Sequence, residues 1–204
     1  MEPLSIKVDS RLVFGAALER LLAKNSFQKI TVNDITSECN AHRSTFYRYF
    51  SDKMELAEWY FRYLADQQAS TVLKNFNPND TVYGESVFLA ILQMMQDKKQ
   101  FFLKLAQYEG QNSFDKIFFR WNMDKVEESI RSSFSKDTLP QNILSSIKFY
   151  YYGETKLIIE WILSGMREKP EKVLEVAVEN IPSPLRPYLK HDSGPQTQQG
   201  CEKK

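Results

Sequence analysis

Side chains suited to contacting a polyanion are concentrated in one short segment, residues 42–53. Its three cations, Arg43, Arg48 and Lys53, are accompanied by a single acid, Asp52. Arginine pairs bidentately with phosphate or with a guanine edge, a threonine methyl contacts thymine, and a tyrosine hydroxyl donates to phosphate. The segment also reads His42-Arg43-Ser44-Thr45-Phe46-Tyr47-Arg48-Tyr49, so it offers each of these chemistries for contacting DNA.

Two short predicted helices position these side chains. Thr31 is a natural N-cap with Asp34 three residues later, and Ile30 and Ile35 stand at the positions of a hydrophobic staple. Asn40 falls where the helix must end in a left-handed residue. A following helix is predicted to run to about Phe50. Helix, four-residue turn and helix together predict a helix-turn-helix, which presents its second helix to the major groove.

The second of these helices has two faces. Phe46 and Phe50 are four residues apart, so they share a face and are expected to pack on Ile35, Cys39 and the first helix. Lys53 opens the next helix, where its ammonium and the free backbone N–H groups are expected to meet one phosphate. The alternative is a helix pair that packs and binds nothing. The residues expected on the opposite face are His42, Arg43, Thr45, Tyr47, Arg48 and Tyr49, and for His42, Arg48 and Tyr49 simple solvent exposure stays open.

The rest of the chain is typical of an all-α protein. Glycine is scarce, with 7 residues, and no run alternates with a period of two. The first helix is expected to begin at residue 9 or 10 and a long fourth helix after Ser51 or Asp52, ending near 77–80. Further helices are predicted at 81–98, 100–107, 113–133, 141–164 and 170–179. The expected organisation is a DNA-binding domain at 1–50, a helical regulatory and dimerisation domain at 51–190 and a disordered tail at 191–204.

Composition and missing motifs disfavour other classes. The net charge is +1, no apolar run approaches the ~20 residues that span a bilayer, and no secretory signal begins the chain. Cys39 and Cys201 are expected to be reduced thiols, so we predict a cytoplasmic protein with no membrane partner. An enzyme is the first competing class. The sequence has no HExxH, P-loop, glycine-rich dinucleotide turn or paired cysteines, so we predict no catalysis, cofactor or metal.

The stretch Ile30-Thr31-Val32-x-x-Ile35 … Arg43-Ser44-Thr45-Phe46-Tyr47-Arg48-Tyr49-Phe50-Ser51-Asp52-Lys53-x-x-Leu56 resembles the signature of the TetR/AcrR family of transcriptional regulators. The resemblance covers about residues 10–56 and implies a three-helix DNA-binding domain, a linking fourth helix, and a dimeric repressor released by an effector. Asn40 stands where the family usually has glycine, and His42 where it has a capping residue, a loss of ~1 kcal/mol at most. The DNA-binding residues that it implies, together with those expected above, are Thr31, His42, Arg43, Ser44, Thr45, Tyr47, Arg48, Tyr49 and Lys53.

The two last main helices carry apolar residues at helical spacing. In the family such helices form a four-helix dimer interface, which sets two recognition helices one DNA turn apart, ~34–36 Å, on a palindromic operator. The alternative is burial within one chain. The interface residues expected from this stripe are Ile147, Tyr151, Glu154, Ile158, Trp161, Ile162, Val173 and Ala177.

The middle helices are rich in large aromatic residues, and the resemblance implies an effector pocket among them. The expected lining residues are Phe88, Phe102, Tyr108, Phe118 and Trp121, and ordinary core packing is the alternative. Residues 152–171 also resemble the dihydroxyacetone-kinase regulators, some of which respond to a protein partner. An activator or a regulator controlled by a protein partner therefore stays open, as does a helical interaction protein that has lost DNA binding.

Overall fold

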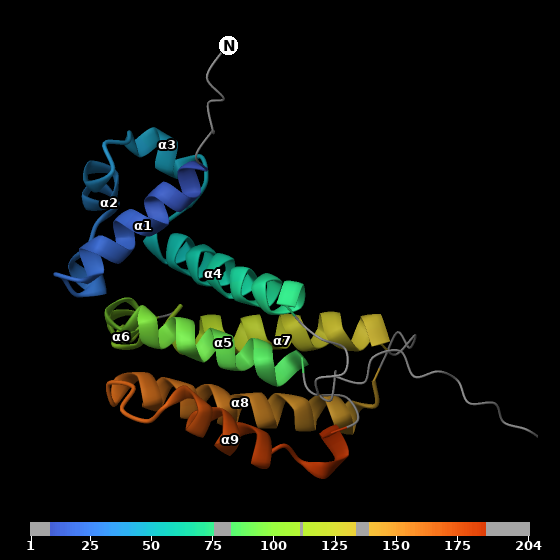
Figure 1. The fold of residues 1–204 in the computed structure, drawn as a ribbon. Helices are drawn as coiled ribbons and strands as arrows, with labels where there is room; N and C mark the ends of the chain where they lie inside the picture. The colour runs from blue at the N-terminus through green and yellow to red at the C-terminus, as the bar shows by residue number, and fades with distance from the viewer. Residues whose placement is uncertain (1–8, 76–82, 111, 134–138, 187–204) are drawn as a thin grey trace, which may run out of the picture.

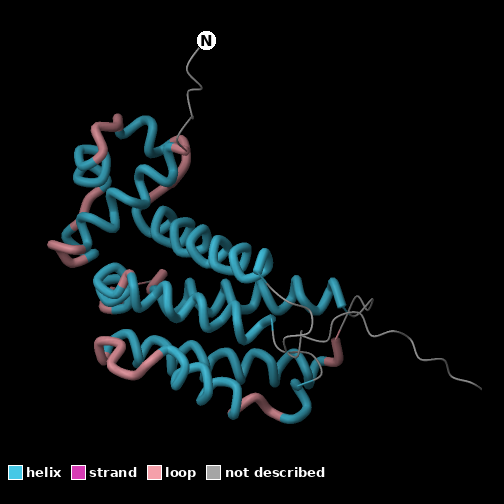
Figure 2. The backbone as a smooth tube through the Cα atoms, in the orientation of Figure 1, coloured by secondary structure: helices cyan, strands magenta, loops and turns pink. Residues whose placement is uncertain are grey.

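The computed structural model describes residues 9–75, 83–110, 112–133 and 139–186, and all regular structure in these ranges is helical (Figures 1 and 2). The predicted all-α class is confirmed. The predicted tail at 191–204 and the break at 77–80 lie outside the described residues. The helices are α1 (Ser10–Leu22), η1 (Phe27–Lys29), α2 (Val32–Glu38), α3 (Arg43–Tyr47), α4 (Lys53–Asn75), α5 (Tyr83–Asp97), α6 (Lys99–Ala106), α7 (Phe114–Ser133), α8 (Gln141–Leu163), α9 (Pro170–Glu179) and η2 (Ser183–Leu185).

The helices are stacked in layers that place α3 at one end of the molecule. Figure 1 shows α1, α2 and α3 grouped together, with α4 leading away beneath them. Helices α5, α6 and α7 follow, and α8 and α9 form the opposite end. The long helix α4 belongs to both halves, because it packs on α1 and also on α5 and α7.

Capping residues set the starts of the helices that carry the N-terminal part. Asp9 accepts from the backbone N–H of Arg11 at 3.0 Å, which begins α1 where the sequence predicts. Asp52 accepts from the N–H groups of Met54 and Glu55 at 2.7 and 2.8 Å and so begins α4. Each such bond satisfies a donor that the helix itself leaves without a partner. The later helices agree with the predicted ranges to within a few residues.

An aromatic cluster around Phe61 joins α4 to α6 and α7. Phe61 is fully buried, and its ring lies against four others at centroid distances of 5.4 to 6.2 Å. Such pairs contribute about 0.5–1.5 kcal/mol each beyond the area they bury. The cluster therefore fixes α4 on α6 and α7. Its other members are Phe102, Phe114, Phe118 and Trp121.

A half-buried ionic junction ties α1 directly to α4 and to the start of α6. Lys98 Nζ lies 2.7 and 2.8 Å from the carboxylate oxygens of Glu19, and the Tyr60 hydroxyl donates to the same carboxylate at 2.8 Å. Burial and the neighbouring Glu19 raise the pKa of Tyr60. Because Glu19 is on α1, Tyr60 on α4 and Lys98 at the start of α6, one carboxylate connects three parts of the chain.

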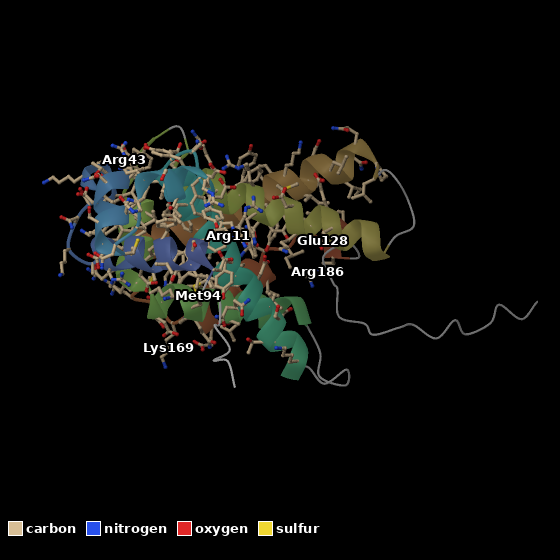
Figure 3. The ribbon with its side chains drawn as sticks, turned by 90° about the horizontal axis from the view of Figure 1, so that it is seen from above. Arg11, Arg43, Met94, Glu128, Lys169 and Arg186 are labelled. Carbon is tan, nitrogen blue, oxygen red and sulfur yellow. The ribbon has the colours of Figure 1, made fainter. Side chains whose placement is uncertain are left out.

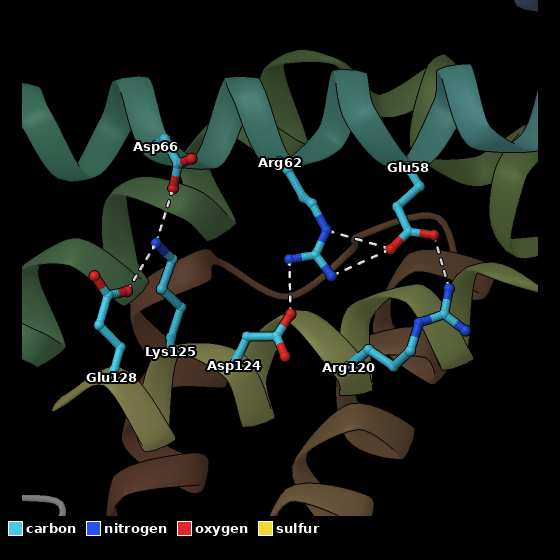
Figure 4. Close-up of polar contacts among 7 residues, drawn as sticks. All are labelled: Glu58, Arg62, Asp66, Arg120, Asp124, Lys125 and Glu128. Atoms are coloured by element: carbon cyan, nitrogen blue, oxygen red, sulfur yellow. Dashed lines mark hydrogen bonds and ion pairs between the residues drawn. The ribbon is translucent and has the colours of Figure 1, made fainter. Parts of the chain in front are cut away.

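Alternating charges hold α4 in one register against α7 (Figure 4). Arg62 bonds to Glu58 on its own helix and to Asp124 at 2.9 Å, while Arg120 reaches Glu58 at 2.7 Å and Lys125 reaches Asp66 at 3.1 Å. A slide by one turn would set like charges opposite each other. Exposed pairs contribute little stability singly. Their pattern nevertheless disfavours the shifted register.

Candidate nucleic-acid interface

Helix α2 begins with a reciprocal cap at Thr31. The backbone N–H of Asp34 donates to Thr31 Oγ1 at 3.2 Å, and the Thr31 N–H donates to Asp34 Oδ2 at 2.8 Å. The Thr31 hydroxyl also donates to Asp34 Oδ2 at 2.7 Å, and this bond, together with the one from the Thr31 backbone N–H, lowers the pKa of Asp34. The predicted capping box is confirmed. It fixes where α2 starts and leaves Thr31 itself exposed.

The turn between α2 and α3 depends on Asn40. Its φ angle is 52°, in the left-handed region that asparagine tolerates better than other side-chain-bearing residues. The reversal lets the Ala41 N–H return to the carbonyl of Thr36 at 2.9 Å. The predicted left-handed end of the helix is confirmed. Asn40 thus sets the direction in which the chain enters α3.

Helix α3 is shorter than the sequence predicts, because it ends at Tyr47 and not near Phe50. The N–H groups of Tyr49 and Phe50 both bond to the carbonyl of Phe46, at 2.9 and 3.0 Å, so the last turn tightens. His42 precedes the helix without making a side-chain cap. The segment from Arg43 to Phe50 therefore consists of about one and a half helical turns and a tight turn that follows them.

The inward face of α3 is aromatic, as predicted. Phe46 is 0% exposed and Phe50 is 3% exposed. The Phe46 ring meets Phe14 of α1 edge-on, with centroids 5.3 Å apart. Ile35 of α2 belongs to the same core, and Cys39 packs against it. The two phenylalanines therefore anchor α3 and determine which side chains face outward.

The outward face of α3 presents a guanidinium and a phenol together. Arg43 Nη2 donates to the Tyr47 hydroxyl at 3.3 Å, and the Arg43 guanidinium lies 5.8 Å from the centre of the Tyr47 ring. Tyr47 is 49% exposed despite its size. Figure 3 shows Arg43 on the surface seen from the α3 end. The sequence-predicted residues that are exposed here are His42, Arg43, Ser44, Tyr47, Arg48 and Tyr49, with Thr45 half-buried.

One basic residue near this surface is absent from the sequence-based set. Arg11, in the first turn of α1, lies 5.0 Å from the Trp59 ring centre and near enough to Tyr49 to interact with it electrostatically. It also pairs with Asp9, and this bond raises the pKa of Arg11. Only its charge and its place at a helix start mark it in the sequence. Folding brings it near Tyr49, just after α3.

Lys53, which the sequence predicts to meet a phosphate, is bonded within the N-terminal part of the chain. Its ammonium donates to the carbonyls of Phe27, Gln28 and Ile30 at 2.7, 3.1 and 2.6 Å. Burial lowers its pKa, and the nearby Asp34 and Asp52 oppose that change. The side chain is therefore turned toward η1, inside the N-terminal part, and is not free to meet a phosphate in this conformation.

Most of the residues predicted to form the dimer interface are buried within the single chain. Only Tyr151, of the eight residues expected there, is half-buried; the others are between 0% and 7% exposed within a single chain and leave little surface for a second copy. The apolar stripe packs on α6, α7 and α9, which is the alternative that the sequence left open. The buried residues are Ile147, Glu154, Ile158, Trp161, Ile162, Val173 and Ala177.

A different apolar stripe of α8 faces solvent. Phe149 is 81% exposed, Tyr152 62% and Leu163 46%, and Val176 of α9 is 39% exposed. Tyr152 stacks on Phe119 of α7 with ring centres 4.1 Å apart. Large apolar side chains gathered on one face mark an interaction surface. The helical spacing of Phe149 and Tyr152 is a sequence signal for this second stripe, although spacing alone does not show which stripe the chain covers.

The residues predicted to line an effector pocket pack against other side chains of the core. Phe102, Phe118 and Trp121 are buried in the cluster around Phe61, and Tyr108 packs on Phe27. Phe88 is half-buried against the same core. None of the five lines the groove found between α8 and α9. That groove is lined by Leu157, Glu160, Trp161, Ser164, Glu168, Lys172, Val173 and Val176.

A buried carboxyl group lies between α7 and α8. Glu154 is 7% exposed, and its Oε1 accepts from Asn122 Nδ2 at 3.2 Å. Burial raises the pKa of Glu154 to about 7, although bonds from Tyr150 and Asn122 oppose the change. The adjoining Tyr150 and Tyr151 phenols also have raised pKa values because of burial. Glu154 sits within an apolar stripe, and this position is its sequence signal.

Other kinds of site are missing from the part of the chain that the structure describes. No three histidine, cysteine, aspartate or glutamate side chains there come together as a metal site. Within the same residues, no helix is long and apolar enough to cross a membrane.

Comparisons with known proteins agree with this architecture. A model described as bacterial regulatory proteins of the tetR family matches residues 16–59, and one described as a transcriptional regulator C-terminal region, within the TetR group, matches residues 85–182. No curated protein sequence matches the chain.

Two solved structures share the fold. The dihydroxyacetone kinase operon activator DhaS is 20% identical, with a TM-score of 0.56 over 83% of this chain and 92% of its own. The TetR family repressor AlkX from Dietzia sp. strain DQ12-45-1b, implicated in biodegradation of n-alkanes, is 14% identical, with a TM-score of 0.50 over 92% and 98%. With the helix-turn-helix at 31–50 and both matched segments in their expected order, the chain belongs to the TetR family of transcriptional regulators.

Proposed function

We propose that this regulator binds a DNA operator through the outward face of α3. The exposed Arg43–Tyr47 pair carries the proposal, because it presents five guanidinium donors and a phenol on a surface anchored by Phe46. Arg48 and Tyr49 extend the same surface, and their side chains also lie together, with the guanidinium 5.9 Å from the ring centre. On the neighbouring helix, Thr31 at the exposed start of α2 is the candidate for a contact with the DNA backbone.

Replacing Arg43 with methionine is expected to weaken binding about 5- to 150-fold, the cost of one lost bidentate contact. If the contact is to phosphate, the slope of log affinity against log salt falls by about 0.9. The probe is a duplex that the wild-type chain selects from a random pool. Lys172→Met on α9 is the control, because Lys172 is an exposed cation far along the chain from α3. Equal losses in the two variants would contradict the proposed interface.

The solvent-facing stripe of α8 supports dimerisation. Phe149 and Tyr152 expose more apolar surface than an isolated chain favours, and Gly153, the residue after Tyr152, has open space where a Cβ would lie. A second α8 can therefore approach this face closely. A two-fold dimer built here joins two α3 helices, and a palindromic operator matches that symmetry.

Phe149→Glu is expected to weaken self-association at least about 30-fold, the effect of removing one interface hot spot. A buried charge without a partner adds to the loss. Sedimentation velocity over a concentration series measures the association constant. Gln67→Glu is the control, because it adds the same charge at an exposed position of α4. An unchanged association constant for Phe149→Glu would show that dimerisation uses another surface.

Repression is the proposed outcome of binding. A dimer covering successive turns of duplex excludes other proteins from that stretch, which favours repression when the operator overlaps a promoter. Release from DNA then requires an effector or protein partner that favours a DNA-free arrangement of the dimer over the DNA-bound one. The binding free energies for the two arrangements would differ by about 1–3 kcal/mol. A reporter gene fused to the selected operator tests the direction, and expression that rises with the regulator would establish activation instead.

A further inference from the structure

The ammonium group of Lys53 is fully engaged inside the N-terminal part of the chain. It has three N–H donors, and three backbone carbonyls accept from it, those of Phe27, Gln28 and Ile30. It also lies 4.7 Å from the centre of the Phe27 ring. An exposed cation available to a phosphate would not be expected to bond to three carbonyls at once.

The carbonyls that hold Lys53 belong to a turn directed toward the regulatory helices. Phe27 is fully buried, and its ring meets Tyr108, just after α6, at a centroid distance of 5.1 Å. In Figure 1 the turn that follows α1 lies on the side of α6, whereas α3 is at the outer end. The ammonium is therefore held against the turn that joins α1 to α2.

Helix polarity explains why this arrangement is stable. Lys53 is the first residue of α4, where the positive end of the helix dipole disfavours a cation. Phe27 and Gln28 belong to η1 and Ile30 ends it, so their carbonyls supply the negative end of a helical turn. The lysine thus caps η1 while it begins α4.

The residue after Ile30 is Thr31, which caps α2. We propose that Lys53 is a positioning residue of the DNA interface, which fixes the start of α2 against the start of α4 and makes no phosphate contact. The proposal rests on the proposed function, because it concerns how the DNA-binding surface is held. It acts through α2, whose buried Ile35 packs in the same core as Phe46 of α3.

Salt dependence separates positioning from phosphate contact. Lys53→Met is expected to weaken binding to the selected duplex roughly tenfold. Its slope of log affinity against log salt is expected to equal the wild-type slope, because no phosphate contact is lost. Arg43→Met, on the exposed surface, is the matched comparison. A slope that falls by about 0.9 in Lys53→Met would overturn the proposal, as would wild-type affinity in a folded variant.

Amine acetylation of the wild-type chain tests the same point without a substitution. Lys53 is expected to react slowly in the free protein and equally slowly with the duplex bound, whereas exposed Lys29 in the same turn reacts quickly. Mass spectrometry of the peptides gives both rates. Fast labelling of Lys53 that DNA suppresses would overturn the proposal. Failure of the wild-type chain to select any duplex refutes the proposed function instead, and is seen before any variant is made.

Discussion

Phe46→Ala is expected to destabilise the N-terminal part of the chain by about 3–5 kcal/mol, the usual cost of removing a fully buried phenylalanine. The Phe46 ring contacts Phe14, Tyr47 and Phe50, so its loss opens a cavity among three elements. Chemical denaturation followed by circular dichroism measures the change. Operator affinity is expected to fall with it, because α3 loses its anchor.

Tyr47→Ala is the matched comparison, one residue further along the same helix. Tyr47 is 49% exposed, so stability is expected to change by less than about 1 kcal/mol while DNA affinity falls. The two variants therefore separate the inward from the outward face of α3. Equal destabilisation by both would mean that α3 is oriented differently from the description given above.

Glu154→Gln is expected to stabilise the protein at pH 8 by up to about 3 kcal/mol. Burial raises the pKa of Glu154 from 4.5 to about 7, and each pKa unit corresponds to about 1.36 kcal/mol. Gln keeps an oxygen that accepts from Asn122 and removes the ionisable group. Thermal or denaturant unfolding across a pH series measures the difference.

The pH range of this effect follows from the direction of the shift. Below about pH 4.5 the carboxyl group is protonated in both folded and unfolded chains, so it costs nothing. As pH rises toward about 7, the unfolded chain releases the proton and the folded chain holds it, so stability falls. Above about 7 the full cost persists.

The wild-type and Glu154→Gln unfolding curves should therefore coincide in acid and separate toward alkaline pH. Glu160→Gln, on the exposed side of the same helix, is expected to follow the wild type throughout. Parallel curves for wild type and Glu154→Gln would contradict the buried environment of this carboxyl group.

The helix-turn-helix was predictable from the sequence because its determinants are local. The Thr31–Asp34 cap, the left-handed Asn40 and the Phe46–Phe50 pair all act within a few residues of one another. The end of α3 was not predictable in this way. The carbonyl of Phe46 accepts two hydrogen bonds, from the N–H groups of Tyr49 and Phe50, and these tighten the last turn. Whether a helix closes with such a turn depends on packing around it.

The sequence does not single out one face of α8 for contact with a second chain, because α8 carries two apolar stripes. One contains Ile158 and Ile162, which are buried, and the other contains Phe149 and Tyr152, which are exposed. Periodicity finds both stripes but does not say which one the rest of the chain covers. The position of α7 and α9 decides this, and it is a property of the tertiary fold.

Lys53 shows the same limit in a single side chain. Its place at the start of a helix beside Asp52 predicts a phosphate contact. The three carbonyls that hold its ammonium lie 23 to 26 residues earlier in the chain. Their approach depends on the packing of η1 against α4, which no local pattern encodes.

Photo-crosslinking tests most directly whether the outward face of α3 enters the major groove. The wild-type chain is irradiated on its selected duplex, in which 5-iodouracil replaces thymine and so presents iodine in the major groove where the thymine methyl stands. We expect the crosslinked peptide to contain residues 43–49, with the adduct on Tyr47 or Tyr49. Crosslinks confined to α5–α9, with none on α3, would contradict the proposed mode of binding.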